Sequence, residues 1–327
     1  MKKIFIILGN GFSIDFLQYL AQFDEKATRK IDVKNLFKFG ETIGTPWDDR
    51  PGFLSYKNCP ALWTLGARPN STVEESTALI EEIITCANMF FDFVNEPEQK
   101  EKRLELTSSS VDRLYLRAYS ELIVYLHHLF SCYDKQITDE LISNFLVSET
   151  RWGWLQFFKS LSTKKYDKIT FITYNYDVWL ERILKSLNIP FSLSGFSDSQ
   201  LNIEIIKPHG SISFVPNGKE DTAYSINYQL DFDGFPLEKL ELKYNNLTRC
   251  SRGAIIPPAG DSVRLELTAP WAQQLRTEAK KAAQKITAND DVILCGLSYW
   301  YVDRKEIDEL LISLNQDANF TFIIMML

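Results

Sequence analysis

The stretch of residues 3–17, KIFIILGNGFSIDFL, constrains the fold of this chain more than any other part of the sequence. Residues 4–8 form a continuous apolar run, which is typical of a parallel strand buried on both faces. The run ends in Gly9-Asn10-Gly11-Phe12-Ser13, and apolar residues at helical spacing follow. A strand, a glycine turn and a helix in this order place backbone N–H groups where a pyrophosphate can bind. Ile14 stands where the dinucleotide fingerprint has its third glycine, so a plain tight turn is an alternative for this stretch.

Strands and helices alternate again in the second half of the chain. Apolar patterns there predict strands at 168–173, 203–206, 254–256, 291–294 and 320–326, and helices at 178–187, 270–286 and 303–314. This alternation predicts an α/β fold with a Rossmann-like parallel sheet and right-handed crossovers.

A large insertion separates the first helix from the second predicted strand. Residues 31–70 are irregular and rich in glycine and proline, whereas helices are predicted at 73–94, 111–133, 137–147 and 154–161. We therefore predict a Rossmann-like domain formed by residues 1–30 and 165–327. Residues 31–164 would form an inserted loop and helical subdomain.

Composition excludes several classes of protein. The net charge of −7 argues against a surface that binds nucleic acid directly. The five cysteines form no C-x-x-C pair and the three histidines are not spaced as ligands, so we expect no metal. An odd number of scattered cysteines suits a reducing compartment, and no apolar run is long enough for a signal peptide or a membrane span. We expect a cytoplasmic protein with no membrane contact.

Polar clusters follow four of the predicted strands directly. They are Gly9–Ser13 after the first strand, then Thr173-Tyr174-Asn175-Tyr176-Asp177, Lys207-Pro208-His209-Gly210-Ser211 and Cys295-Gly296-Leu297-Ser298. Ligands of parallel α/β sheets bind at the carboxyl ends of the strands. We therefore expect the four clusters to share one crevice, although they span nearly the whole chain.

Several residues of these clusters have a chemical and a structural interpretation. His209 is a natural general base near neutral pH, or a loop histidine bound to backbone. Asn175 could orient a water or a sugar hydroxyl, and Asp177 could bind a ribose or cap the following helix. Ser13 is expected to contact phosphate or cap a helix, and Asp15 to complement the helix dipole.

Two further histidines, His127 and His128, lie mid-helix between leucines. Their neighbours suggest that one faces solvent while the other packs. We assign no chemistry to either.

Together the four clusters resemble the motifs of the SIR2 (sirtuin) family. Residues 9–13 are similar to its G-A-G-x-S phosphate turn, and residues 173–177 to its T-Q-N-x-D box, whose asparagine and aspartate line the nicotinamide–ribose pocket. His209-Gly210 resembles the H-G that carries the catalytic histidine, and residues 296–298 the G-x-S on the adenosine side. The resemblance implies catalytic roles for Asn175, His209 and Asp177. It implies NAD+ contacts for Gly9, Asn10, Gly11, Phe12, Ser13, Asp15, Thr173, Tyr174, Gly210, Gly296, Leu297 and Ser298.

Departures from the family pattern decide which activity the resemblance implies. The four-cysteine zinc module of deacylating sirtuins is missing, and residues 254–260, AIIPPAG, carry prolines where those enzymes bind a peptide as an added strand. The helical insertion is similar to SIR2-like proteins of bacterial antiphage defence, which hydrolyse NAD+ to ADP-ribose and nicotinamide.

The resemblance thus implies an NAD+ glycohydrolase, a hydrolase of N-glycosyl bonds that depletes NAD+ in antiphage defence. NAD+ would be its substrate, and no metal would take part. The alternatives are an NAD-dependent protein deacylase and a non-catalytic module that senses NAD+ or ADP-ribose. We expect a homo-oligomer formed through the helical insertion. We also expect an activating or inhibiting protein partner, because an unregulated enzyme of this type would kill its host.

Overall fold

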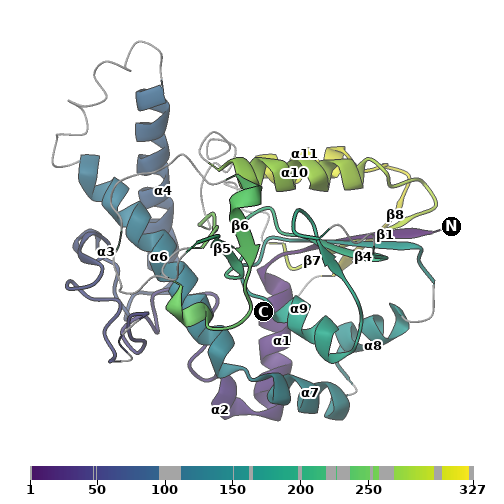
Figure 1. The fold of residues 1–327 in the computed structure, drawn as a ribbon, viewed down its shortest axis with the longest axis horizontal. Coiled ribbons are helices and arrows are strands. Elements are labelled where there is room, and N and C mark those ends of the chain that lie inside the picture. The colour runs from purple at the N-terminus through teal and green to yellow at the C-terminus, as the bar shows by residue number, and fades with distance from the viewer. Residues whose placement is uncertain are drawn as a thin grey trace.

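A computed structural model gives the fold (Figure 1). It describes residues 2–46, 48, 50–95, 112–149, 151–161, 165–197, 201–218, 226, 236–250, 253–257, 269–297 and 304–323. In this described part, no helix is long and apolar enough to cross a membrane.

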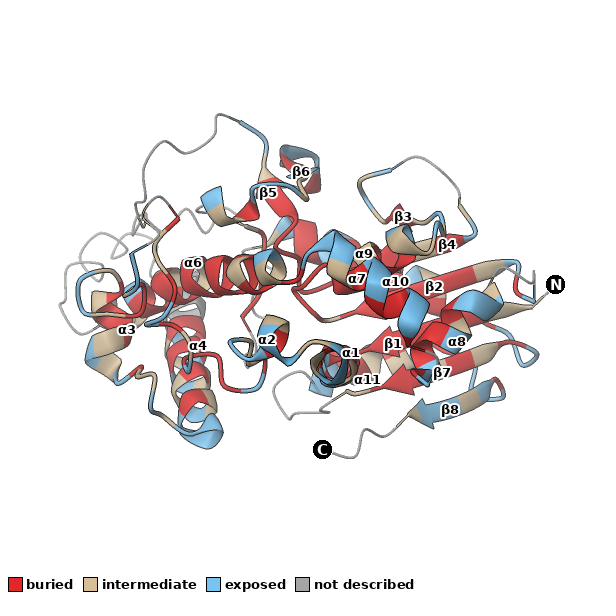
Figure 2. Cartoon of the chain, turned by 90° about the horizontal axis from the view of Figure 1, so that it is seen from below, coloured by how far each residue is buried: buried red, intermediate tan, exposed pale blue. Residues whose placement is uncertain are grey.

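A six-stranded, all-parallel sheet lies at the centre of the molecule. The sequence predicts a parallel sheet, but it does not predict the short edge strand at Ser192–Leu193. Leu8 at the end of the first strand pairs in register with both Thr173 and Cys295, so three strands end at the same level. Figure 2 shows that the inner strands are buried, whereas β8 at one edge is largely exposed. The order across the sheet is β3 (Ser192–Leu193), β4 (Ile203–Ile206), β2 (Lys168–Thr173), β1 (Lys3–Leu8), β7 (Asp291–Cys295) and β8 (Asn319–Ile323).

The strand order reverses at β1. The chain passes from β1 to β2 and β4 on one side, and later returns to place β7 and β8 on the other side. The loops after β1 and β7 therefore flank the switch point, which is where parallel α/β sheets bind ligands. This architecture is that of a Rossmann-like α/β fold.

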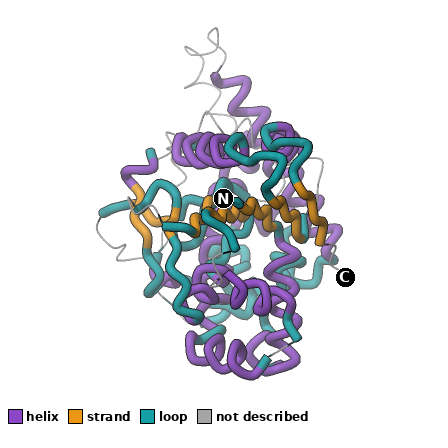
Figure 3. The backbone as a smooth tube through the Cα atoms, turned by 90° about the vertical axis from the view of Figure 1, so that its right-hand side faces the viewer, coloured by secondary structure: helices purple, strands orange, loops and turns teal. Residues whose placement is uncertain are grey.

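Helices cover both faces of the sheet (Figures 1 and 3). Helices α10 (Pro270–Ala283) and α11 (Arg304–Ile312) lie on one face. The other face carries α1 (Asn10–Phe23), α7 (Asp139–Ser148), α8 (Gly153–Ser160) and α9 (Trp179–Ser186).

The rings of Trp152, Phe16 and Phe145 pack together between α1 and the segment that leads into α8. Trp152 is fully buried there. The last part of the predicted insertion, α7 and α8, thus packs on helices of the sheet layer, and the division of the chain at residues 31 and 164 stays a prediction.

Three of the remaining helices lie beside the carboxyl edge of the sheet, whereas the short helix that follows α1 lies at the end of α1 away from the sheet (Figure 1). Helix α4 begins with a capping box, in which Thr72 N donates to Glu75 Oε2 at 2.8 Å and Glu75 N donates to Thr72 Oγ1 at 3.1 Å. This confirms the helix start that the sequence predicts. The helices are α2 (Glu25–Thr28), α3 (Pro60–Leu65), α4 (Val73–Asn95) and α6 (Asp112–Gln136), and α6 packs against α3 and α4.

The strand predicted at 254–256 is wrong. Ile255 forms only an isolated antiparallel bridge with Gly210, because this segment pairs with a turn rather than with the parallel sheet, and Pro257 follows at once. Elsewhere the sequence does not predict the short antiparallel pair of β5 (Phe214–Pro216) and β6 (Leu240–Leu242), nor the 3-10 helices η3 (Leu237–Lys239) and η4 (Leu247–Arg249).

The two mid-helix histidines are both buried, so the expectation that one of them faces solvent is wrong. His127 Nε2 lies 3.0 Å from Ile212 O on one side of α6, and His128 Nε2 lies 3.0 Å from Gly44 O on another. Helix α6 is covered on both sides because it lies between the loops after the strands and the irregular loop of the insertion.

Candidate functional site

The glycine turn is tighter than the sequence suggests. Helix α1 begins at Asn10, so most of the turn forms the first helical turn, with Gly9 as its N-cap. Gly11 N donates to Gly296 O at 3.1 Å, and Phe12 N donates to Gly9 O at 3.1 Å. Asn10 N, in contrast, donates to no residue of the described part of the chain. One N–H group at the start of α1 thus has no acceptor among the described residues.

Close approach of two backbones explains the glycines at this point. A Cβ atom on Gly9 would lie 2.5 Å from Gly296 O, and one on Gly296 would lie 2.3 Å from the Cα atom of Gly11. Gly296 also has a φ of +59°, which favours glycine. The loops after β1 and β7 are therefore packed directly on one another at the switch point.

Ser13, Asn175 and Asp177 form one buried hydrogen-bonded cluster. Ser13 Oγ donates to Asp177 Oδ2 at 2.6 Å, and Asn175 Nδ2 donates to Ser13 Oγ at 2.9 Å and to Gly9 O at 3.0 Å. Among the described residues, no hydrogen bond engages Asn175 Oδ1. The loops after β1 and β2 thus meet as expected, and the amide of Asn175 keeps an acceptor for a ligand.

Both oxygens of Asp177 have partners within the protein, and its contact with a ribose stays a prediction. Its Oδ1 accepts from Trp179 N at 3.1 Å, which caps the start of α9, while Oδ2 accepts from Ser13. Burial raises the pKa of Asp177 to about 6, although Lys207 and the Ser13 hydroxyl oppose the shift. Asp177 is therefore a carboxyl group that changes charge near neutral pH.

A buried ion pair lies next to this cluster and stabilises it. Lys207 Nζ donates to Asp177 O and lies 3.0 Å from Glu181 Oε1, and the side chains of Lys207 and Glu181 are fully buried. Lys207 belongs to the cluster after β4, so the pair also ties that loop to α9.

His209 is held by a carboxylate that comes from a distant helix. Its Nε2 lies 3.1 Å from Glu306 Oε2 at the start of α11, and Arg276 Nη2 of α10 lies 3.0 Å from the same oxygen. All three side chains are buried. Among the described residues, no hydrogen bond engages His209 Nδ1. Sequence reasoning missed Glu306 and Arg276, because an acidic residue in a first helical turn and an arginine within a helix carry no local sign of pairing.

The loop of His209 is tied to the loop after β2. The ring of Tyr174 lies edge-on to the imidazole at 4.8 Å between centroids, and Ile212 N donates to Tyr176 O at 3.0 Å. Gly210 has a φ of +81°, and a Cβ atom there would lie 1.8 Å from Ala254 O. The P-H-G sequence thus fixes the imidazole between Tyr174 and Glu306.

Thr173 and Tyr174 have backbone roles as well. Thr173 Oγ1 accepts from Asn175 N at 3.2 Å, and Tyr174 N donates to Leu8 O at 3.1 Å. These bonds fix the position of Asn175 beside the end of β1.

Two residues of the turn use their side chains for packing or loop contacts. The Phe12 ring is buried and lies edge-on to Trp154 at 5.3 Å. Asn10 Nδ2 donates to Val33 O at 2.9 Å. A ligand would meet the backbone of these residues rather than their side chains.

The remaining predicted residues lie farther along these elements. Asp15 lies beyond the first turn of α1, so the role at the helix dipole that the sequence suggests is wrong. Asp15 Oδ2 accepts from Trp152 Nε1 at 2.7 Å, and burial raises its pKa despite that bond. Leu297 is partly buried after β7, and Ser298 lies outside the described residues.

The arrangement can serve acid–base chemistry at the carboxyl edge of the sheet, with an amide acceptor, a carboxyl group of raised pKa and an imidazole paired with a carboxylate. Over the described ranges, no group of three or more His, Cys, Asp and Glu side chains is placed to hold a metal ion. Comparison with known proteins adds no family: no family model matches the chain, and no curated protein matches it significantly.

Proposed function

We propose that this chain is a SIR2-like NAD+ glycohydrolase, which cleaves NAD+ to ADP-ribose and nicotinamide. One observation carries the proposal: Asn175, Asp177 and Ser13 form one cluster, and a His209 held by Glu306 sits on the adjoining loop. Both groups lie after parallel strands, where such sheets bind nucleotides.

The reaction would proceed through a ribose with oxocarbenium character, as in glycoside hydrolysis. The C1′–N bond breaks and its electron pair leaves with nicotinamide, while a water oxygen bonds to C1′. Asn175 Oδ1 would accept a hydrogen bond from that water or from a ribose hydroxyl. Because Glu306 occupies Nε2 of His209, Nδ1 would take the proton that the water loses. Asp177, when ionised, would stabilise the positive charge on the ribose.

To bind a pyrophosphate, the glycine turn must offer backbone N–H groups as donors. Among the described residues, the N–H of Asn10 at the start of α1 has no acceptor, whereas the N–H of Gly11 is used by Gly296 O. Binding through both groups would require the loop after β7 to move away from Gly11. We expect NAD+ to change the contact between these two loops.

The test is the release of nicotinamide and ADP-ribose from NAD+ by the purified chain, without any peptide. Asn175→Ala and His209→Ala should each lower the rate by roughly 100-fold or more, the usual contribution of a positioned acid–base group. Asn315→Ala, in an exposed turn, is the control and should keep full activity. Full activity in both site variants would overturn the proposal. Because such an enzyme must be held inactive until triggered, NAD+ content is also compared in cells that express each variant.

One observation favours a second candidate, a module that binds NAD+ or ADP-ribose without turnover. Nδ2 of Asn175 and both oxygens of Asp177 already have partners within the protein. Calorimetry that gives tight binding, with no product by chromatography from the same activated sample, would select this candidate.

The deacylase alternative has less support. Ser211 N donates to Ala254 O and Ile256 N donates to His209 O, both at 3.0 Å, so the chain itself occupies the backbone beside His209. NAD+ consumption only in the presence of an acylated peptide would favour the deacylase.

A further inference from the structure

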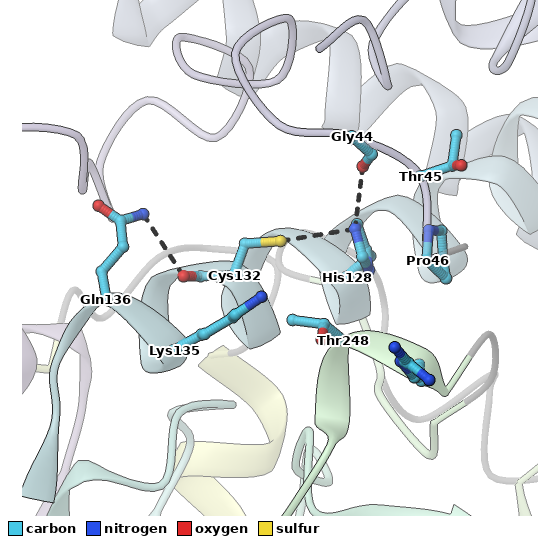
Figure 4. Close-up of a pocket in the computed structure, with 9 residues that line it drawn as sticks. Gly44, Thr45, Pro46, His128, Cys132, Lys135, Gln136 and Thr248 are labelled. Atoms are coloured by element: carbon cyan, nitrogen blue, oxygen red, sulfur yellow. Dashed lines mark hydrogen bonds between the residues drawn. The ribbon is translucent and has the colours of Figure 1, made fainter. Parts of the chain in front are cut away.

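A second polar cavity lies on the insertion side of helix α6 (Figure 4). It has a volume of 630 Å³ and lies between α6, the loop at residues 44–46 and the 3-10 helix η4. None of the proposed catalytic or NAD+-binding residues lines it. The lining residues that matter for its chemistry are Thr45, His128, Lys135, Gln136, Thr248 and Arg249.

The described residues that line this cavity carry positive charge. Lys135 on α6 and Arg249 on η4 contribute two cations from different elements, and none of the described residues that line the cavity is a carboxylate. Within the described ranges, Lys135 forms no ion pair. A cavity with cations of one sign attracts small anions and raises their local concentration.

Two acidic groups near the cavity, among the described residues, have cations of their own. Asp48, close to Thr45 along the loop, accepts from Arg50 Nε at 2.8 Å. Asp134, which precedes Lys135, accepts from Arg182 Nη1 at 2.6 Å. Neither acid therefore neutralises Lys135 through a direct contact.

Neutral hydrogen-bonding groups complete the cavity. Thr45 and Thr248 supply hydroxyl groups from opposite walls, whereas the amide Nε2 of Gln136 donates to Cys132 O at 3.4 Å. His128 Nε2 is within hydrogen-bond distance of Gly44 O, which fixes the loop to α6. The walls of the cavity are thus held together without the ligand.

We propose that this cavity is a second ligand site, which binds a small organic molecule that carries phosphate. Cations together with hydroxyl groups are the donors that phosphate oxygens use. A volume of 630 Å³ is within the range of about 300–1,000 Å³ of small-molecule sites and exceeds what a single inorganic phosphate fills. The organic part of the ligand would occupy the remaining space.

Helix α6 connects this cavity with the loop of His209. His127, next to His128 on α6, contacts Ile212 O, three residues after His209. A ligand that shifts α6 would therefore move this loop. An effect on NAD+ cleavage rests on the proposed function, whereas binding to the cavity does not.

The test is calorimetry of the full chain with inorganic pyrophosphate and, separately, with ADP. Wild type should bind both probes. The double variant Lys135→Gln/Arg249→Gln should bind them at least about tenfold more weakly, since each charged hydrogen bond contributes about a factor of ten. The double variant Arg29→Gln/Lys30→Gln removes the same charge from exposed positions outside the cavity and should bind like wild type.

Several results would overturn the proposal. One is the absence of binding to wild type at millimolar concentrations of either probe. Another is equal binding by the two double variants, which would place the probe elsewhere, for example at the start of α1. Binding of pyrophosphate without ADP would exclude an organic ligand. If the double variant unfolds, the single variant Lys135→Glu, at an exposed position, repeats the test. It should weaken the binding of both probes.

Discussion

Glu306 determines how the imidazole of His209 is held. Its Oε2 faces both His209 Nε2 and Arg276 Nη2, so one carboxylate joins the loop after β4 to helices α10 and α11. A carboxylate on one ring nitrogen fixes the orientation of an imidazole and leaves the other nitrogen for a substrate. Glu306 is therefore a positioning residue, and Arg276 keeps its buried charge balanced.

We expect Glu306→Gln to lower kcat of NAD+ cleavage by roughly 10- to 100-fold with little change in KM, because orientation rather than binding is lost. Steady-state kinetics on the activated protein checks this. Glu309→Gln is the matched control: Glu309 lies on the same helix and pairs with Lys280 of α10, but at the surface. A similar loss in both variants, or a rise in KM alone, would contradict a positioning role.

Helix α1 and the loop after β7 contact each other through backbone atoms rather than through side chains. Gly9 and Gly296 have no side chain, so the two backbones touch, and the start of α1 is fixed against the neighbouring strand. A side chain at Gly9 has to displace backbone atoms, which cannot turn aside as a flexible side chain would.

We expect Gly9→Ala to lower the free energy of unfolding by about 1–3 kcal/mol, the usual cost of overpacking. Gly153→Ala is the control, because a Cβ atom at this helix start meets nothing within 4 Å. The control should leave stability unchanged or raise it slightly. Urea unfolding followed by circular dichroism measures both, and equal stability of the two variants would show that the loops separate easily.

Elements whose apolar pattern lies within one short stretch of sequence could be predicted. The apolar runs of β2 and β4 predict both strands with the observed bounds, and the rule for parallel strands predicts that Ser13 and Asn175 meet. Pairing between distant segments could not be predicted. Glu306 lies 97 residues from His209 and reaches it only through the packing of α11. The bridge of Ile255 likewise depends on a turn that follows another strand.

At the scale of the whole molecule, helix α6 lies between the candidate site and the second cavity. Its two histidines are buried and neutral, and burial lowers the pKa of His127 and of His128 to about 4. The unfolded chain binds these protons at about pH 6.5, so acid favours unfolding between pH 6.5 and 4. Asp177 opposes this, because its raised pKa makes the folded chain bind a proton between pH 6 and 4.

We expect stability to fall as the pH is lowered from 6.5 to 4. At pH 5, proton linkage lowers the free energy of unfolding by about 2 kcal/mol for each histidine and raises it by about 1 kcal/mol for Asp177. The effect of the histidines is therefore the larger one. His127→Gln keeps an N–H donor for Ile212 O without titrating, and should flatten the dependence. Melting temperatures at pH 7.5 and 5 check this, with Asp48→Asn as control, because the pKa of the exposed Asp48 is about 2. A wild type whose stability does not fall towards pH 5 would contradict it.

The central position of β1 has a consequence for synthesis of the chain. This strand is made long before its neighbours β2 and β7, and the bond from Lys3 N to Asp290 Oδ1 joins residues 287 apart. At roughly 5–20 residues per second, the ribosome needs tens of seconds to supply β7. Until then one edge of an apolar strand stays without its final partner. We expect nascent chains to need chaperones, and completion of the sheet to be a late and slow step of folding.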